Sequence, residues 1–583
     1  MSAVPGKANG ASAGPGVSRA SDPSDPSGAS GAKSSGSLRN ILILQLARLG
    51  DLVQTVPLLR RMRREHSEAR IVLVALEGPS GILSDCGYFD RLVTLPLKDL
   101  EGLSDPGNQD RFPDLVPFSV HPEFRQSWDL IVNLTNDLGS AVLCEKIPAT
   151  EKLGRINTYA GELRLLGPWA KYLFSMVSHR RDNLFNLVDI QMGMAGLKPE
   201  PEEACLQVPE AREREAHSLL ASLGRRPGRK LVALQTGASE LHRAWSLENF
   251  AAVAQDLSAN GFADIVLMGD AGERARTEQL AEMIGMPVLN LAGRTPLPLL
   301  PAVLQACDLL ISNDTGTIHV AAATGTPTLG LYFSTAYFSE TAPYGGNHAV
   351  LQVEIPCAPC YASARCPVQL CRDYLAPEAV VEASRWLLDT AGRAPGEALA
   401  EPPRAHPNLS LYRSRFLANG SLIYLPARSE HPSPHYLTGL IGRLLWEEVL
   451  GLSRDPILEE LWRNARGTKA WERKLSELEA ALAALAIPFH SGLQLAADLH
   501  REFDAEVPSR ERIHALHGDL ARLGAPLAGS AKEAGLVGSF LQYEIMDMDY
   551  AHYPALAGLL RDKYGKLAEW IARIEATLRR LAR

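Results

Sequence analysis

The chain has 583 residues, of which 46% are hydrophobic and 22% charged, and its formal net charge at pH 7 is −8. A chain of this length requires more than one hydrophobic core, and its composition is that of an ordinary folded protein. The acidic balance gives no general attraction for nucleic acid, and no apolar run reaches the ~20 residues that a membrane-spanning helix needs.

The first 37 residues consist mainly of Gly, Ser, Ala and Pro, with almost no large apolar side chains. Such a segment cannot bury enough apolar surface to fold, so we expect residues 1–37 to be a disordered tail. The segment also lacks the apolar region of a signal peptide. We therefore expect a cytoplasmic protein, whose cysteines stay reduced and form no disulfides.

The two segments that follow show the same sequence pattern, in which short apolar runs alternate with helical patterns. Residues 38–211 contain the expected strands Ile41–Leu46, Ile71–Leu76, Leu92–Leu95 and Leu130–Leu134. Residues 230–392 contain the expected strands Leu231–Leu234, Ile265–Met268, Val288–Leu291, Leu309–Ser312 and Thr328–Tyr332. Continuous apolar strands separated by helices predict parallel sheets that are covered on both faces. The fold class is therefore α/β, with two Rossmann-like doubly wound domains that face a cleft and a polar linker over 212–229.

The last segment, 401–583, has a different pattern, with a hairpin signal followed by helical patterns. Arg413–Leu417 and Ser421–Leu425 flank Asn419-Gly420, a two-residue turn signal that predicts a hairpin. The remainder is expected to be mainly helical and carries no motif for chemistry. The expected helices are Tyr436–Leu450, Ala470–Leu485, Leu493–Phe503, Arg510–Leu523 and Tyr564–Leu581.

The first chemical motif follows the first predicted strand, where Gly50 permits a tight turn and Asp51 stands just before a helix. In open α/β sheets this crevice at the carboxyl end of a strand is where ligands bind. The Asp51 carboxylate can cap the helix, or it can remove a proton from an incoming hydroxyl. No G-x-G-x-x-G motif follows the strand, which argues against a dinucleotide-binding dehydrogenase.

The second motif is Asn313–His319, where an apolar strand runs into Asn-Asp-Thr-Gly-Thr and then into an Ala-rich helix. Free backbone N–H groups and the positive end of the helix dipole converge at such a turn and can bind phosphate. Thr315 and Thr317 add hydroxyls, Gly316 allows close approach, and His319 lies in the first helical turn. A capped helix with a hydrogen-bonded histidine is the alternative.

Two more strand ends carry polar groups. Thr236 and Gly237 follow one strand, and Arg243 in the same loop can supply a positive charge for a diphosphate or be a solvated surface charge. Asp270 and Glu273 follow the next strand, where a carboxylate suits a ribose diol or a helix cap.

Together these motifs resemble glycosyltransferase family 9, the bacterial ADP-heptose:lipopolysaccharide heptosyltransferases. The resemblance covers roughly residues 39–388 and rests on order and spacing. The matching segments are Gly50-Asp51 with Thr55-x-Pro57, Thr236-Gly-Ala238 with Arg243-x-Trp245, and Asn313-Asp-Thr-Gly-x-x-His319. At Arg243 the family usually has a lysine, a change that keeps the charge but not the shape.

The resemblance implies a GT-B fold and an inverting transfer of heptose from ADP-heptose to a lipopolysaccharide-core acceptor, with Asp51 as the general base and no cofactor needed for catalysis. The donor-binding residues that we predict are Thr236, Gly237, Arg243, Asp270, Glu273, Asp314, Thr315, Gly316, Thr317 and His319. Three alternatives stay open: another donor sugar, another acceptor, or a sugar-nucleotide-binding scaffold without catalysis.

Four of the eight cysteines lie close together, at Cys357, Cys360, Cys366 and Cys371. Four thiolates suit a tetrahedral structural zinc or iron site, whereas reduced thiols that pack a loop are the alternative. The iron-binding finger of the related autotransporter heptosyltransferases resembles this segment. We favour the structural metal.

Residues 563–583 form an expected amphipathic helix with a basic polar face. Such a helix can lie on the inner membrane, where a lipid-linked acceptor would be found, or it can pack on its own domain. We favour packing on its own domain.

Overall fold

The structure is a computed structural model. It describes residues 38–104, 121–157, 162–238, 240–360, 366, 368–390, 401–403, 406, 408–428, 433–503 and 569–581, with single positions at 509, 511, 512, 515, 516, 519 and 565. The predicted disordered tail lies outside these residues.

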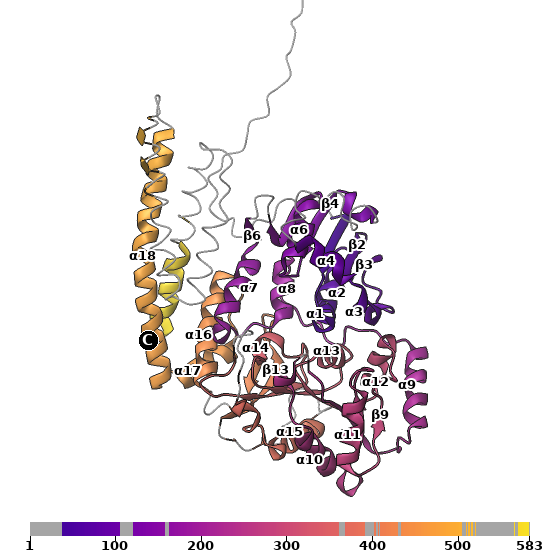
Figure 1. Cartoon of the computed structure of the whole chain (residues 1–583). Helices are drawn as coiled ribbons and strands as arrows, with labels where there is room; N and C mark the ends of the chain where they lie inside the picture. Colours follow the sequence, from indigo (N-terminus) through magenta and orange to yellow (C-terminus); the bar gives the residue numbers. More distant parts are fainter. Residues whose placement is uncertain are drawn as a thin grey trace, which may run out of the picture. The chain divides into compact units, whose positions relative to one another are not determined.

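The first sheet has six strands, in the order β3-β2-β1-β4-β5-β6 (Figure 1). Their bounds are β1 Asn40–Gln45, β2 Arg70–Leu76, β3 Arg91–Leu95, β4 Trp128–Asn133, β5 Ala149–Asn157 and β6 Leu163–Leu166. All neighbouring strands are parallel except β5 and β6. Ile41 and Ile43 belong to one buried cluster and Leu42 and Leu44 to another, so β1 is covered on both faces as its continuous apolar run predicts.

The second sheet has eight strands, in the order β14-β13-β12-β11-β10-β7-β8-β9. Their bounds are β7 Lys230–Gln235, β8 Ala263–Met268, β9 Leu289–Asn290, β10 Leu309–Asn313, β11 Thr328–Tyr332, β12 His348–Val353, β13 Leu409–Phe416 and β14 Leu422–Pro426. The six strands β7–β12 are parallel, and β13 and β14 add an antiparallel pair at one edge.

Both sheets contain the same doubly wound order, in which the first strand of each half lies beside the fourth. The chain changes direction between β1 and β4 in one half and between β7 and β10 in the other. Ligands of open α/β sheets bind at such a switch point, outside the carboxyl ends of the strands. The predicted α/β class and the nine predicted strands are confirmed. Strands β5, β6 and β12 were not predicted.

Helices cover both sheets. In the first half they are α1 Leu49–Gln54, α2 Val56–Glu65, α3 Glu77–Ser80, α4 Leu97–Ser104, α6 Leu138–Lys146, α7 Pro168–Ser178 and α8 Leu187–Met194. In the second half they are α10 Leu247–Ser258, α11 Arg274–Ile284, α12 Leu300–Gln305, α13 Gly316–Ala323, α14 Phe338–Thr341 and α15 Pro377–Thr390.

Two segments differ from the expected domain boundaries. Helix α9, Glu210–Ser222, occupies much of the segment expected as a linker, 212–229. The hairpin β13–β14, expected within the accessory region, pairs with β12 and extends the second sheet. The hairpin thus joins the fold of the second half.

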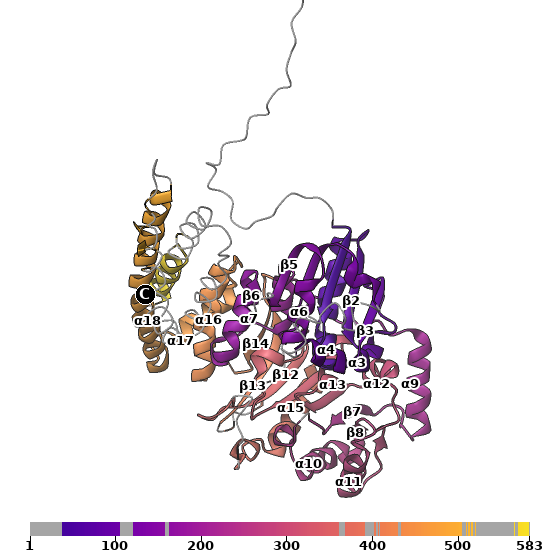
Figure 2. The same cartoon turned by 45° about the horizontal axis from the view of Figure 1, so that its top comes forward.

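The C-terminal region is helical in the part that the structure describes. Its helices are α16 Pro434–Val449, α17 Pro456–Ala465 and α18 Lys469–Phe503, with a further helix over 569–581 that lies beside α18 in Figures 1 and 2. Helix α18 is continuous where two helices were expected, and most of the expected helix Arg510–Leu523 lies outside the described residues. No described helix has both the length and the apolarity to cross a membrane.

Buried polar groups connect this C-terminal region to the first half. Arg443 on α16 is fully buried, pairs with Glu447 at 3.1 Å and lies over the ring of Phe185, with its Cζ 3.6 Å from the ring centroid. Asp189 on α8 is also fully buried and accepts the backbone N–H of Leu422 at 2.8 Å, which links the β14 strand of the second sheet to the first half. One hydrophobic cluster includes residues of both sheets, of α16–α18 and of 569–581, so the helical region shares the core of the two halves.

Candidate active site

The turn after β1 places a carboxylate at the switch point of the first sheet. Arg48 is the N-cap residue of α1 and has no side-chain cap, and Asp51 lies in the first turn rather than before the helix. Burial raises the pKa of Asp51, and the nearby Asp314 carboxylate adds to this rise. The backbone N–H groups of Arg48 and Asp51 itself, with the Arg48 charge, oppose it. Because its carboxylate receives the N-cap N–H, Asp51 supports the helix while it also faces the cavity described below.

The turn after β10 is held by the buried side chain of Asn313. Its amide nitrogen donates to the carbonyl oxygens of Thr236 at 3.0 Å and Gly237 at 3.1 Å, and its amide oxygen accepts the backbone N–H of Trp245 at 3.1 Å. One side chain therefore fixes the loop after β7 to the loop after β10. Helix α13 begins at Gly316 with Thr315 as its N-cap residue, whose side chain makes no cap hydrogen bond to the N–H groups of the first turn.

An ion pair crosses this end of the second sheet. Arg243 Nη2 donates to Asp314 Oδ2, and both side chains are largely buried. Burial raises the pKa of Asp314, whereas the positive charges of Arg243 and Arg180 lower it. Arg180, which belongs to the first half, binds both carboxylate oxygens of Glu340 at 2.7 Å. One arginine from each half thus adds positive charge near Asp314.

The two halves touch through a pair of glycines. A Cβ atom on Gly50 would lie 2.9 Å from His319 Cδ2, and one on Gly316 would lie 3.2 Å from the Gly50 nitrogen. Only glycine fits both positions without a shift of α1 or α13. His319 is buried against this contact, and burial lowers its pKa to about 4, so the ring is neutral at pH 7.

These elements enclose a cavity of about 230 Å³. Its lining combines the turn at α1 in the first half with Arg243, α14 and the start of α13 in the second half. The lining residues are Arg48, Gly50, Asp51, Gln54, Arg243, Asp314, Thr315, Gly316, His319 and Thr341. The structure therefore brings together six predicted site residues: Asp51, Arg243, Asp314, Thr315, Gly316 and His319.

The other predicted site residues lie outside this lining. Thr236 is fully buried, and a Cβ on Gly237 would lie within bonding distance of a Glu273 carboxylate oxygen, so the loop and Glu273 are packed together. Asp270 and Glu273 accept each other's backbone N–H, at 3.0 and 2.9 Å. Of these two carboxylates, that of Glu273 contacts the Gly237 loop and also accepts the Gln235 side-chain amide. Thr317 is half-buried in the first turn of α13.

Of the four other lining residues, Gly50 was named in the first motif only as a turn residue, and Arg48, Gln54 and Thr341 were not predicted. Arg48 and Gln54 are three residues before and after Asp51, which puts all three on neighbouring turns of one helix. That spacing was the signal that could have found them. Thr341 ends α14, a four-residue helix without a motif, and no pattern in the sequence marks it.

Arg180 and Arg181 donate hydrogen bonds to backbone carbonyls in the segment that contains the first two of the four clustered cysteines. Arg180 donates to the Cys360 carbonyl at 3.1 Å, and Arg181 donates to the Ala358 carbonyl at 2.8 Å. The Cys366 thiol accepts the Gln369 N–H at 3.2 Å, which lowers its pKa. Among the described residues, no three His, Cys, Asp or Glu side chains converge on a point that could hold a metal ion. The zinc or iron site at the cysteines therefore stays a prediction.

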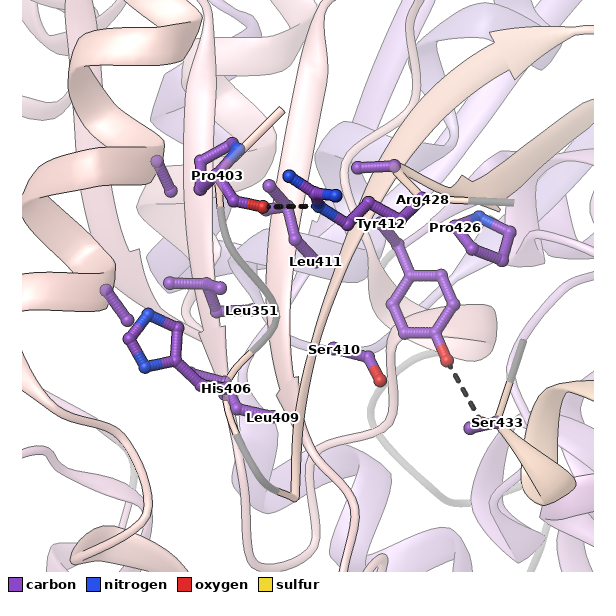
Figure 3. Close-up of a pocket in the computed structure, with 13 residues that line it drawn as sticks. Leu351, Pro403, His406, Leu409, Ser410, Leu411, Tyr412, Pro426, Arg428 and Ser433 are labelled. Atoms are coloured by element: carbon purple, nitrogen blue, oxygen red, sulfur yellow. Dashed lines mark hydrogen bonds between the residues drawn. The ribbon is translucent and has the colours of Figure 1, made fainter. Parts of the chain in front are cut away.

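A second cavity, of about 90 Å³, lies between β13 and α15 (Figure 3). Its wall contains none of the predicted site residues. Arg428 in this wall donates to the Pro403 carbonyl at 2.9 Å, and Tyr412 lies 3.3 Å from the Ser433 hydroxyl. These polar groups hydrogen-bond within the protein, so the cavity is a feature of how the hairpin packs.

The amphipathic helix near the C-terminus packs on its own domain. Ile571, Ile574, Leu578 and Leu581 are nearly fully buried, and Trp462 on α17 donates to the Leu581 carbonyl at 3.2 Å. This packing removes the apolar face that an interfacial helix would insert into lipid.

Residues 120–369 match the model of glycosyltransferase family 9 (heptosyltransferase). Lipopolysaccharide heptosyltransferase 3 of Escherichia coli is 24% identical over 288 residues, which are 49% of this chain and 81% of that protein. Lipooligosaccharide heptosyltransferase 2 of Campylobacter jejuni is 31% identical over 169 residues, which are 28% of this chain and 52% of that protein.

Solved structures of similar proteins include the glycosyl transferase family 9 protein of Veillonella parvula. It is 18% identical, with a TM-score of 0.46 over 60% of this chain and 97% of that chain. E. coli ADP-heptose lps heptosyltransferase II is also 18% identical, with a TM-score of 0.44 over 60% of this chain and 98% of its own. On the family match and the named relatives, residues 120–369 form a glycosyltransferase family 9 (heptosyltransferase) domain, and the protein is a glycosyltransferase.

Proposed function

We propose that this protein moves a heptose from ADP-heptose to a lipopolysaccharide-core acceptor, with inversion at the anomeric carbon. The observation that carries the proposal is the cavity, which is lined by Asp51 of the first half and by the Asn313–His319 turn of the second half, where we predict phosphate binding. Two relatives, a lipopolysaccharide and a lipooligosaccharide heptosyltransferase, support the choice of sugar and acceptor.

The donor diphosphate would lie at the N-terminus of α13. Backbone N–H groups at Gly316 and Thr317, with the Thr315 hydroxyl, provide hydrogen-bond donors there, and the helix dipole favours negative charge. Arg243 adds a fixed positive charge at the same wall of the cavity. In the free protein it pairs with Asp314, so donor binding places Arg243 between a carboxylate and a phosphate.

Asp51 would act as the general base. The acceptor hydroxyl gives its proton to the Asp51 carboxylate while its oxygen bonds to the anomeric carbon, and the bond from that carbon to the diphosphate oxygen breaks as ADP leaves. Burial raises the pKa of Asp51 and makes its carboxylate a better proton acceptor, provided that it stays ionised at the working pH. A base on the face opposite the leaving group is the arrangement that a single, inverting displacement requires.

The leaving group would be stabilised without proton donation from His319. With a pKa of about 4 the ring is neutral at pH 7, so it can donate a hydrogen bond but carries no charge. The charge that develops on ADP would be met by Arg243 and by the end of α13.

The test is transfer from ADP-heptose by the wild type and by Asp51→Asn, which keeps the side-chain shape and removes the basic oxygen. We expect the variant to transfer about 10²–10⁴-fold more slowly, while its affinity for ADP is unchanged. Asp256→Asn, the same change at an exposed residue of α10, is the matched control. An Asp51→Asn protein that transfers at the wild-type rate would remove the proposed base.

The donor itself is tested by thermal shift with ADP-heptose and with other nucleotide sugars, such as UDP-glucose and GDP-mannose. A ligand that binds only the folded protein raises its Tm. A larger shift with another nucleotide sugar would replace the proposed donor, and tight binding of ADP-heptose without transfer to any core acceptor would favour a sugar-nucleotide-binding scaffold.

A further inference from the structure

Gln54 is a buried side chain whose amide has no partner within the protein. The residue is 4% exposed and lines the cavity between the two halves. Its Nε2 atom is sealed from solvent and makes no hydrogen bond with any described residue. Because Gln54 follows Asp51 by three positions on α1, the two side chains share one face of the helix.

Two other buried glutamines, Gln45 and Gln352, use their amide nitrogens in hydrogen bonds, whereas the side-chain oxygen of the buried Gln191, which does not line this cavity, also has no partner among the described residues. Gln45 donates to the Thr55 hydroxyl at 2.9 Å, and Gln352 donates to the Val353 carbonyl at 3.1 Å while it accepts the Phe338 N–H at 3.1 Å. A buried amide without a partner costs free energy, since it loses its hydrogen bonds to water and gains none. Such a group at the wall of a cavity indicates a ligand that completes it.

A second lining residue, His319 of the other half, also has a buried nitrogen without a partner in the described part of the chain. His319 is 6% exposed, and its Nδ1 has no hydrogen-bond partner among the described residues. The cavity therefore has one unpaired polar nitrogen on α1 and one on α13, in addition to its charged residues. A ligand with several hydroxyl groups on different sides would satisfy both.

We propose that Gln54 donates a hydrogen bond to a hydroxyl oxygen of the sugar that is transferred, and so takes part in the choice of sugar. This inference rests on the proposed function. The diphosphate side of the cavity is built from Arg243 and the start of α13, whereas Gln54 is neutral and belongs to the opposite half. The sugar must lie between them, since its anomeric carbon has to reach the acceptor oxygen beside Asp51.

The experiment compares ADP with ADP-heptose, which carries the sugar on its β-phosphate; because each ligand is compared between variant and wild type, an effect on ADP-heptose alone reports contacts to the sugar. Their Kd values are measured by calorimetry for the wild type and for Gln54→Met, which keeps the length of the side chain and removes the amide. We expect the Kd of ADP-heptose to rise about tenfold in the variant, and the Kd of ADP to stay unchanged.

A matched control and the Tm separate this role from a structural one. Gln255→Met makes the same change on the surface of α10, where the amide donates to Met283 and Ile284, and we expect both Kd values to stay at the wild-type level. Gln54→Met should have a Tm no lower than the wild type, because the free protein loses no hydrogen bond.

Equal Kd values for ADP-heptose in the wild type and Gln54→Met would overturn the inference about Gln54 and leave the proposed function standing. An equal loss of affinity for ADP and ADP-heptose, or a lowered Tm, would also overturn it, because a contact to the sugar affects neither ADP nor the free protein. If the wild type does not bind ADP-heptose, the proposed donor fails and the inference fails with it.

Discussion

Replacement of Gly50 by alanine tests whether the two halves meet as closely as the structure shows. The added methyl carbon would lie 2.9 Å from His319 Cδ2 and 3.4 Å from Gly316 Cα, whereas carbon atoms in good contact are about 3.5–4.0 Å apart. His319 is buried on α13, so either its ring must shift within the cavity that it lines or α1 and α13 must separate by several tenths of an ångström.

Overpacking of this kind costs about 1–3 kcal/mol. With about 2–4 °C of Tm per kcal/mol for a domain of 150–250 residues, we expect the Tm to fall by about 2–12 °C. The same separation moves Asp51 away from the start of α13, so transfer should slow even where the variant is fully folded. Calorimetric unfolding and ADP-heptose turnover at a temperature well below the Tm measure the two effects independently.

Gly78→Ala is the matched control. Gly78 lies in α3, and a Cβ atom there would meet nothing within 4 Å, so we expect a Tm at or slightly above that of the wild type and unchanged turnover. If Gly50→Ala also keeps the wild-type Tm and turnover, the close approach of α1 and α13 is wrong.

Three further predictions concern the charges and the thiols. Arg243→Met should raise the Kd of ADP about 10–100-fold, because a charge-assisted hydrogen bond to the diphosphate is lost; unchanged affinity in calorimetry would place Arg243 outside the donor site. Burial raises the pKa of Asp189 to about 7, above its value of about 3.9 in the unfolded chain. Between about pH 4 and pH 7 the Asp189 carboxyl is therefore protonated in the folded protein and ionised in the unfolded chain. The free energy of unfolding falls as the pH rises from about 4 to about 7, by up to about 4 kcal/mol. Asp189→Asn should remove this part of the pH dependence in denaturant unfolding, and identical pH profiles for variant and wild type would contradict it. Elemental analysis of the purified protein should find about one zinc or iron per chain, absent when the four clustered cysteines are replaced by serine; metal-free wild-type protein would leave them as packing thiols.

The sequence predicts the strand ends because the apolar runs that precede them are continuous and end in Gly, Asn, Asp or Thr. Asp51 and the Asn313–His319 turn could be named for that reason, and the parallel topology brings them to facing edges. Strand β5 was not predicted because its sequence, Ala149–Asn157, mixes polar and apolar residues, and only three of its nine residues are buried. Strand β12 begins with a buried histidine and includes a buried glutamine, so its pattern is not purely apolar.

The pairings within the site could not be predicted from one sequence, because they join residues far apart in the chain. Arg243 and Asp314 are 71 positions apart, and the contact of Gly50 with Gly316 depends on how the two halves approach each other. A local pattern also cannot show that the amide of Gln54 lacks a partner, since that depends on every element that surrounds it.

The side chain of Asn313 links two loops of the second half without any contribution from the first half. By tying the loop after β7 to the loop after β10, it keeps the phosphate-binding surface assembled within the second half alone. The residues proposed to act on the sugar, Asp51 and Gln54, belong to the first half. Under the proposed function, we therefore expect substitutions in the loops of the first half to change the preference for the sugar and to leave the affinity for ADP unchanged.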